Sequence, residues 1–231
     1  MRRSAPIPDN GALLRLLQLA SPSLPVGAYS YSEGLEFAVE QRAVADAATL
    51  QKWLEDALQY GGVRVEAAVL VRAYDARIAD KGGAVCYWNE WLTAARESEE
   101  IRMQNHEMGR ALFKLLVELD PPPRDVVPLL TGQCNFAVAF AVAAAHWGIA
   151  RDAAVTGYLQ TWTANIVGAG VKLIPLGQTA GQRLLWDLRR AIEATAGAAA
   201  TIEDDDLAVS NWGQALASMQ HETQYSRLFR S

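Results

Sequence analysis

Apolar residues recur every three or four positions along most of the chain, which is the period of an α-helix with one face turned toward a core. The first such stretch runs from Asn10 to Ala20 and should end before Pro22, because proline disfavours a helical residue directly before it. No strand–turn–strand pattern interrupts the helical periodicity. The pattern therefore predicts an all-α fold: a single-domain bundle of roughly eight to ten helices spanning residues 1–231.

Local signals suggest where the individual helices begin and end. Ser30 and Glu33 have the spacing of a capping box and predict a short helix from Tyr31 to Gln41. Asp46 is expected to cap the next helix, which should end near Gly61. Further helices are expected over Glu66–Asp80, over Ala84–Leu119 as one helix or as two that meet near Glu97–Glu100, and over Arg124–Leu130, Asn135–Trp147, Ala153–Ile174 (capped by Asp152) and Thr179–Ala196. The segment Asn135–Trp147 is apolar on nearly all sides, so it is predicted to be the buried central helix.

Composition narrows the class of protein. With 231 residues and 51% hydrophobic side chains, the chain can bury a full core. A net charge of -5 without a Lys/Arg cluster argues against nucleic-acid binding. The most apolar stretch, Phe136–Ile149, is too short to span a bilayer, so no membrane association is expected. Two cysteines, Cys86 and Cys134, and the absence of an apolar leader near Met1 favour a cytoplasmic protein.

The sequence lacks the common catalytic and cofactor motifs. There is no phosphate-binding loop and no nucleophile elbow, and Arg110 stands where the helix beginning at His106 would need a second metal-binding histidine. Gly168 and Gly170 lie inside a helical pattern and predict close helix packing. One acidic run, Asp204–Asp206, could serve a magnesium-dependent all-helical enzyme, but a solvated loop is the favoured interpretation. We therefore expect no catalytic residue, no metal site and no cofactor.

Two segments are unusual for a plain helical bundle. The loop from Ser21 to Gly34 carries tyrosines and little charge, and it could either close the core or form a contact surface. The tail at about 219–231 places Tyr225, Leu228 and Phe229 at helical spacing, flanked by arginines. The cost of ordering such a tail suggests that it becomes ordered only when docked on a partner. Packing on its own domain remains the other interpretation.

Three separated motifs resemble the UreF family of urease accessory proteins. These are LLQLASPSLPVGAYSYSEGLE from Leu16 to Glu36, LIPLGQT from Leu173 to Thr179, and YSRLF from Tyr225 to Phe229. The resemblance implies an all-α, non-enzymatic homodimer that joins the accessory protein UreD (also called UreH). The complex would then recruit the GTPase UreG, modulate its activity and engage apo-urease for nickel insertion. One position departs from the family pattern, since Gln133 follows Gly132 where the family commonly has a histidine.

The same resemblance implies which residues contact partners. The family's terminal segment becomes ordered against UreD and shapes the surface that receives UreG. This gives Arg227 and Arg230 as expected polar contacts and Tyr225 and Phe229 as expected anchors. By analogy, the loop from Ser21 to Gly34, which we call the early loop, could also face a partner. The full set of expected partner-binding residues is Tyr225, Ser226, Arg227, Leu228, Phe229 and Arg230 in the tail, with Gly27, Tyr29, Tyr31 and Glu33 in the loop.

Overall fold

The computed structural model describes residues 10–121 and 132–231, and within these ranges the regular secondary structure is helical, without a strand. The predicted all-α class is confirmed. The helices are α1 (Asn10–Leu19), α2 (Leu35–Glu40), α3 (Ala47–Tyr60), α4 (Gly62–Ile78), α5 (Gly82–Ala94), α6 (Glu99–Leu119), α8 (Phe136–His146), α9 (Arg151–Leu173), α10 (Gln178–Ala199) and α11 (Trp212–His221), with 3₁₀ turns η1 (Ala28–Ser30) and η2 (Asp204–Asp206). The predicted helix at Arg124–Leu130 lies outside the described residues.

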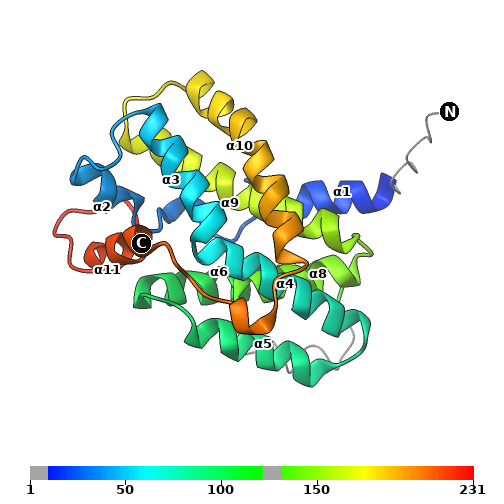
Figure 1. The fold of residues 1–231 in the computed structure, drawn as a ribbon. Helices are drawn as coiled ribbons and strands as arrows, with labels where there is room; N and C mark the ends of the chain where they lie inside the picture. The colour runs from blue at the N-terminus through cyan, green and yellow to red at the C-terminus, as the bar shows by residue number, and fades with distance from the viewer. Residues whose placement is uncertain (1–9, 122–131) are drawn as a thin grey trace.

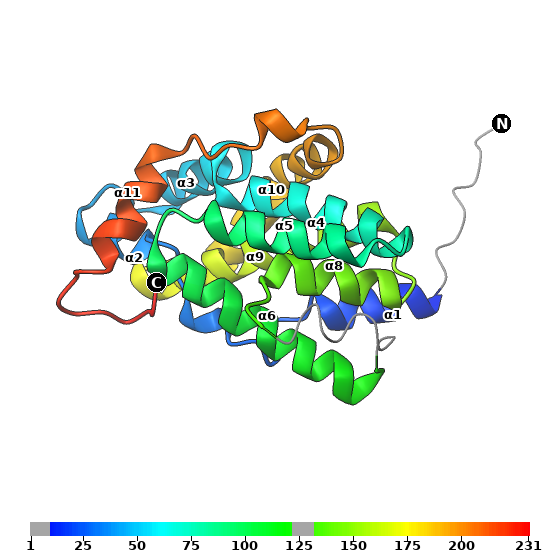
Figure 2. The same cartoon turned by 90° about the horizontal axis from the view of Figure 1, so that it is seen from below.

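Helix α8 lies at the centre of the bundle (Figures 1 and 2). All its residues from Phe136 to Ala144 are buried, and its most extensive contacts are with α4 and α6. The predicted central helix is therefore confirmed. A helix that is apolar on every side can be stable only where other helices cover it completely, so this segment fixes the middle of the fold. None of the helices in the described part of the chain is both long enough and apolar enough to cross a bilayer.

Glycines allow close approaches between elements around this core, and two of them fix how the helices meet. A Cβ atom on Gly170 would lie 2.4 Å from Cδ2 of Leu50, so α9 can meet α3 only because position 170 lacks a side chain. The predicted small-residue packing is confirmed at Gly170, whereas a Cβ on Gly168 would meet nothing within 4 Å. A Cβ on Gly109 would lie 2.1 Å from the main-chain oxygen of Cys134, which places α6 directly against the chain that leads into α8.

Several helix boundaries agree with their local signals. Asp46 caps α3 through its Oδ1, which accepts from the amide of Thr49 at 2.9 Å, and the reciprocal bond completes a capping box. The long pattern from Ala84 to Leu119 forms two helices, with Ser98 capping the second through a bond from the amide of Ile101. In both cases the cap and the residues that it serves are neighbours in sequence.

Two predicted caps are wrong. Helix α2 begins at Leu35, after Gly34 with φ of 81°, and Ser30 Oγ donates to the carbonyl of Gly27 instead of capping a helix. Glu33 is buried and makes its bonds elsewhere in the fold. Asp152 lies in the first turn of α9, whose N-cap is Ala150, and makes no cap hydrogen bond. Spacing identified suitable residue types at these positions but not their tertiary surroundings.

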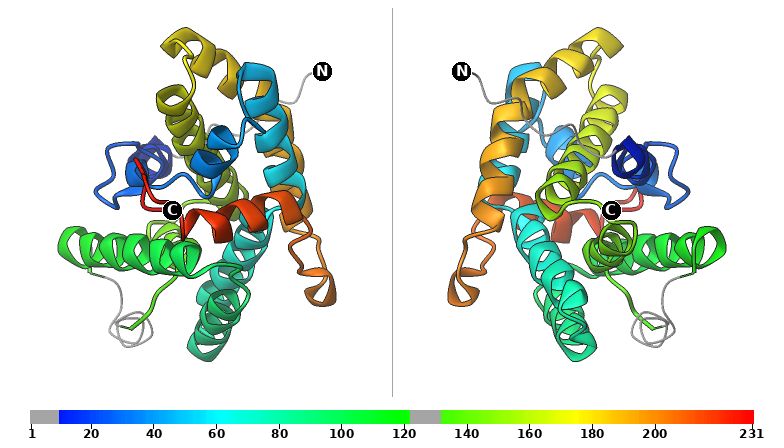
Figure 3. Two further views of the ribbon diagram at one scale, coloured as in Figure 1. Left: turned by 90° about the vertical axis from the view of Figure 1, so that its left-hand side faces the viewer. Right: turned by 90° about the vertical axis from the view of Figure 1, so that its right-hand side faces the viewer.

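The last segment of the chain packs along the outside of the bundle, and its final residue, Ser231, is buried. Helix α11 crosses one face and ends at His221, and residues 222–231, which we call the strap, follow in an irregular path (Figure 3). The helical spacing of Tyr225, Leu228 and Phe229 is therefore not used in a helix. The strap returns to the early loop, where the amide of Ser32 donates to the main-chain oxygen of Ser231 at 2.9 Å.

Candidate functional site

The strap is packed against its own chain. Phe229 is only 5% exposed, and Ser231 is buried, whereas Tyr225 is fully exposed and Leu228 is largely exposed. In the structure the strap therefore packs on its own domain, which is one of the two interpretations that the sequence left open. It also separates the two expected anchors, because Tyr225 points outward while Phe229 fills a slot in the bundle, with the Lys172 ammonium 5.5 Å from its ring centre.

Glu36 of α2 holds the main chain of the strap. Its Oε1 accepts from the amide of Leu228 at 2.6 Å, and its Oε2 accepts from the amide of Phe229 at 2.8 Å. Glu36 is itself buried. Hydrogen bonds from main-chain amides to a carboxylate are among the stronger ones in proteins, so this pair fixes the strap without using its side chains.

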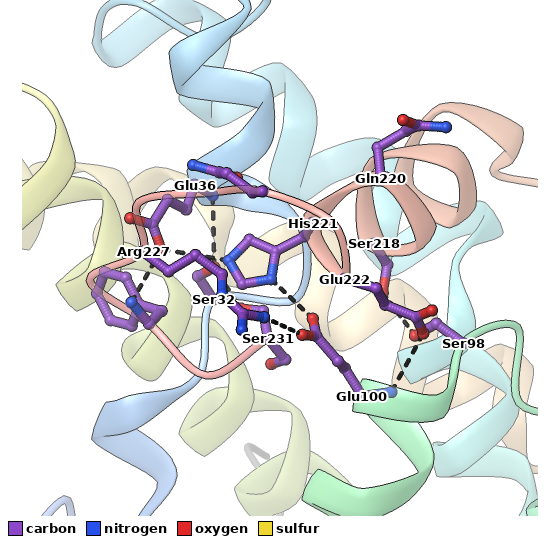
Figure 4. Close-up of polar contacts among 12 residues, drawn as sticks. Ser32, Glu36, Ser98, Glu100, Ser218, Gln220, His221, Glu222, Arg227 and Ser231 are labelled. Atoms are coloured by element: carbon purple, nitrogen blue, oxygen red, sulfur yellow. Dashed lines mark hydrogen bonds and ion pairs between the residues drawn. The ribbon is translucent and has the colours of Figure 1, made fainter.

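His221, at the end of α11, lies between two carboxylates (Figure 4). Its Nδ1 is 2.7 Å from Glu100 Oε2, and its Nε2 is 3.3 Å from Glu36 Oε2. The other oxygen of Glu100 accepts from Arg227 Nη1 at 2.5 Å. One imidazole thus contacts α2 and α6 directly and is linked to the strap through Glu36 and Glu100.

The adjacent residue, Glu222, completes the start of α6. Its Oε1 accepts from the amides of Glu99 and Glu100 at 2.8 and 3.4 Å, two of the amides that a helix leaves without an internal partner. Ser98 Oγ lies 2.7 Å from Ser218 Oγ and ties the same turn to α11. The last turn of α11 therefore docks on the first turn of α6 (Figure 4).

Arg230 pairs with Glu107 of α6 through two bonds, at 2.7 and 2.9 Å. The hydroxyl of Tyr31 donates to Glu107 Oε2 at 2.6 Å. Burial, and then the hydrogen bond to Glu107, raise the pKa of Tyr31, while the bonds from Arg230 and Tyr31 lower the pKa of Glu107. Tyr31 thus belongs to the support of the strap, although its ring sits in the early loop.

Glu33 points into the core, contrary to its expected role at the surface. Its oxygens accept from Gln104 Nε2 at 2.8 Å and from Trp162 Nε1 at 2.9 Å. Burial, and then the charge of Glu66, raise its pKa to about 7. Ser231 Oγ donates to Gln104 Oε1 at 2.6 Å, so Glu33 supports the strap from behind.

Beneath Glu33 lies a buried ion pair. Arg96 Nη2 is 2.6 Å from Glu66 Oε1, with both side chains almost completely buried. The hydroxyl of Tyr158 donates to Glu66 Oε2 at 2.6 Å. Burial lowers the pKa of Arg96, but the charges of Glu66 and Glu97 outweigh it, so the pKa is raised. The network links α4, α9 and the connection between α5 and α6 behind the early loop.

The remaining expected contacts divide between surface and interior. Tyr29 is exposed at the tip of the loop, beside Gly27, whose φ of 78° allows the preceding turn. A groove of about 420 Å³ opens between the strap and α6. Its walls are Tyr31, Glu100, Met103, Gln104, Glu107, Arg227, Leu228, Phe229 and Arg230. The outward part of the candidate site is therefore the strap with this groove, and Tyr29 lies apart from it.

The acidic run does not form a metal site. Asp204 pairs with Arg72 at 2.6 Å and remains largely exposed, and the run forms the short η2 turn. Across residues 10–121 and 132–231, no three His, Cys, Asp or Glu side chains are placed to hold a metal ion. The magnesium-enzyme alternative therefore gains no support from the arrangement of this run.

Sequence reasoning missed the three residues that organise the strap. His221 is 185 residues from Glu36 and 121 residues from Glu100, so no local spacing joins them. The sequence offers one signal: Glu36 is the last residue of the motif that begins at Leu16, and His221 lies within the tail at about 219–231.

Comparison with known proteins identifies the family of the chain. The UreF family profile matches residues 44–189. A urease accessory protein UreF from Nostoc sp. is 52% identical, with 94% of this chain and 95% of the relative covered. Proteins of the same name from Microcystis aeruginosa and Alkalilimnicola ehrlichii are 49% and 43% identical, over 96% and 94% of this chain and 99% and 95% of theirs. The chain therefore belongs to the UreF family of urease accessory proteins.

Proposed function

We propose that this chain serves urease maturation as a binding protein: it joins UreD/UreH and the complex recruits UreG to insert nickel into apo-urease. The observation that carries the proposal is that one side of the strap is bound to the bundle and the other side is exposed. Its main chain is held by Glu36, while Tyr225 and Leu228 project outward. A segment that is already ordered loses little conformational entropy when it binds. Its exposed apolar side chains can therefore contribute more fully to affinity.

The outer face of α11 extends this surface. Trp212, Leu216 and Met219 are all exposed, and they recur at the spacing of one helical face. The helix carries no Asp, Glu, Lys or Arg. An exposed apolar row on a helix fits an apolar groove of a partner, and tryptophan is among the residues that contribute most at interfaces. We therefore assign α11 and the strap together as the surface for UreD.

Arg227 and Arg230 border this surface. Both are partly exposed, and both already pair with glutamates of α6. Their guanidinium groups remain partly open to solvent while paired, so they can also contact a partner that docks on this surface. Their expected role in receiving UreG is retained in the proposal, with the strap held in place mainly by its main chain and Phe229.

The proposed mechanism is coupling between binding sites. A partner that docks only on the ordered strap favours one assembled state, and the same coupling acts in reverse on the strap. Nickel is the cargo of the assembly. The homodimer, the regulation of GTP hydrolysis and a partner contact at Tyr29 are further parts of the proposal that rest on the family. The cytoplasmic location is also proposed, from the cysteine usage of the sequence.

The test uses residues that do not support the fold. Tyr225→Ala combined with Leu228→Ala should abolish retention of UreD in a pull-down, with little change in the thermal midpoint, because both side chains face solvent. Trp186→Ala is the matched control, since this exposed aromatic lies on α10 outside the surface. Normal retention by the double variant would contradict the assignment.

A second experiment separates the binding protein from the enzyme alternative. Replacing Asp204, Asp205 and Asp206 together by Asn should leave urease activation intact, because their carboxylates line no buried site. The purified chain should also hydrolyse no GTP by itself. Loss of activation in the Asn variant, with the fold preserved, would favour the magnesium-dependent alternative.

A further inference from the structure

Two carboxylates, that of the buried Glu36 and that of the partly buried Glu100, each hold both the His221 ring and the strap. Glu100 uses Oε2 for His221 Nδ1 and Oε1 for Arg227. Glu36 uses Oε2 for His221 Nε2 and for the amide of Phe229, and Oε1 for the amide of Leu228. The imidazole is thus the bridge between the two groups that fix the strap (Figure 4).

The hydrogen-bond partners define the protons on this ring. An ionised carboxylate can only accept, and a neutral imidazole carries one N–H and one bare nitrogen. With a single proton, one ring nitrogen would direct its lone pair at a carboxylate oxygen. With a proton on each nitrogen, the contacts at 2.7 and 3.3 Å are both hydrogen bonds.

The alternative, a proton on one of the carboxyl groups, conflicts with their other bonds. Both oxygens of Glu36 already accept from strap amides, and Glu100 Oε1 accepts from a guanidinium. Glu100 also lies in the first turn of α6, where the helix favours negative charge. Each carboxylate therefore has reasons to stay ionised that do not involve the ring.

The charge balance leads to the same arrangement. The charged groups around the ring are Glu36 from α2, Glu100 from α6 and Arg227 from the strap. The next residue in sequence, Glu222, accepts from the amide of Glu99 at the start of α6. Arg227 compensates one of the two carboxylates that touch the ring. Since His221 is 0% exposed, the second needs a buried positive partner, which the doubly protonated ring supplies.

We propose that His221 is a positioning residue that carries a proton on each ring nitrogen and thereby locks the strap in its docked place. Without the second proton, the carboxylates of Glu36 and Glu100 lie on opposite sides of a ring that can donate a hydrogen bond to only one of them. The strap then loses the coordinated hold of Glu36 and Glu100. This lock is a property of the chain itself, whichever partner binds. Its effect on UreD binding rests on the proposed function.

The ring protons can be observed directly. The chain has three histidines, so His221→Gln assigns the His221 signals in a ¹⁵N spectrum of the full-length protein by their disappearance. At neutral pH both His221 nitrogens should resonate as protonated, and Glu100→Gln should convert the ring to a neutral tautomer. A bare nitrogen on His221 in the wild-type protein, with the strap docked, would overturn the proposal.

Trypsin measures the lock, because Arg227 and Arg230 are cleavage sites within the strap. His221→Gln and Glu100→Gln should each speed cleavage after Arg227 by roughly tenfold or more, as expected for the loss of charge-assisted hydrogen bonds. The matched controls are His146→Gln, which alters a partly exposed histidine near Asp120, and Glu118→Gln, on the exposed side of α6. Cleavage as slow as in the controls would contradict the lock.

Retention of UreD distinguishes the two proposals. If the spectrum and the cleavage rates behave as expected and His221→Gln still retains UreD normally, the lock stands and the assignment of the strap as the docking surface fails. If the ring is neutral while Tyr225→Ala with Leu228→Ala loses UreD, the surface stands and the lock fails.

Discussion

Removing the charge of Arg96 tests how the core tolerates its buried acids. Arg96→Met keeps much of the side-chain volume but leaves Glu66 with the Tyr158 hydroxyl as its remaining partner. The side chains of Arg96 and Glu66 are 3% and 6% exposed, so water cannot replace the guanidinium. Loss of one member of such a pair costs about 3–5 kcal/mol. For a chain of this size, that corresponds to a fall in the thermal midpoint of about 10 °C.

The measurement is urea and thermal unfolding of the wild type, Arg96→Met and the double variant with Glu66→Gln. The double variant removes both charges and should recover about half of the loss or more, because no uncompensated charge then remains buried. Arg64→Met, a change of a partly exposed arginine on α4, controls for the substitution itself. A loss below about 1 kcal/mol in Arg96→Met would refute the reasoning, since it would place the pair in a solvated environment.

Three further predictions follow from the interior of the fold. The Glu33 carboxyl group binds its proton more tightly in the folded protein than in the unfolded chain, so its stabilising contribution is present below the ordinary carboxyl pKa and is lost as the pH rises to about 7. The free energy of unfolding should fall by up to about 3 kcal/mol over that interval. Glu33→Gln should flatten this pH dependence of the free energy of unfolding, measured by urea titrations. Phe229→Ala should cost about 3–5 kcal/mol of strap docking, seen as fast hydrogen exchange over residues 222–231 with α8 still protected; slow exchange in the strap would contradict this. Gly109→Ala should destabilise the protein by about 3 kcal/mol, because its Cβ would overlap the carbonyl of Cys134, whereas Gly168→Ala should be neutral or stabilising; equal effects in thermal unfolding would disprove the close approach.

The parts of the fold that follow from sequence are those set by local or one-dimensional patterns. The cap at Asp46 depends on a residue three positions away, and the central position of α8 depends only on its apolar character. Both could be predicted because the determining groups lie within one segment. The all-α class follows from the same periodicity, repeated along the chain.

The candidate site depends on contacts between distant segments, which explains the errors there. Glu33 has the spacing of a capping residue, yet tertiary packing turns it toward Trp162. Phe229 and Tyr225 look equivalent as anchors, and only the irregular path of the strap sends one inward and the other outward. The motif at the end of the chain identified the right segment, but which of its side chains remain available depends on α2 and α6.

The contact between Ser32 and Ser231 spans 199 positions in the sequence. During synthesis, α2 and α6 leave the ribosome well before the strap that they hold, and the strap cannot dock until Ser231 itself has been made. The surface formed by the docked strap therefore exists only on chains that have been translated through to this point. A truncated product would lack it even if its helices had folded, so a partner that recognises this surface would also discriminate against incomplete chains.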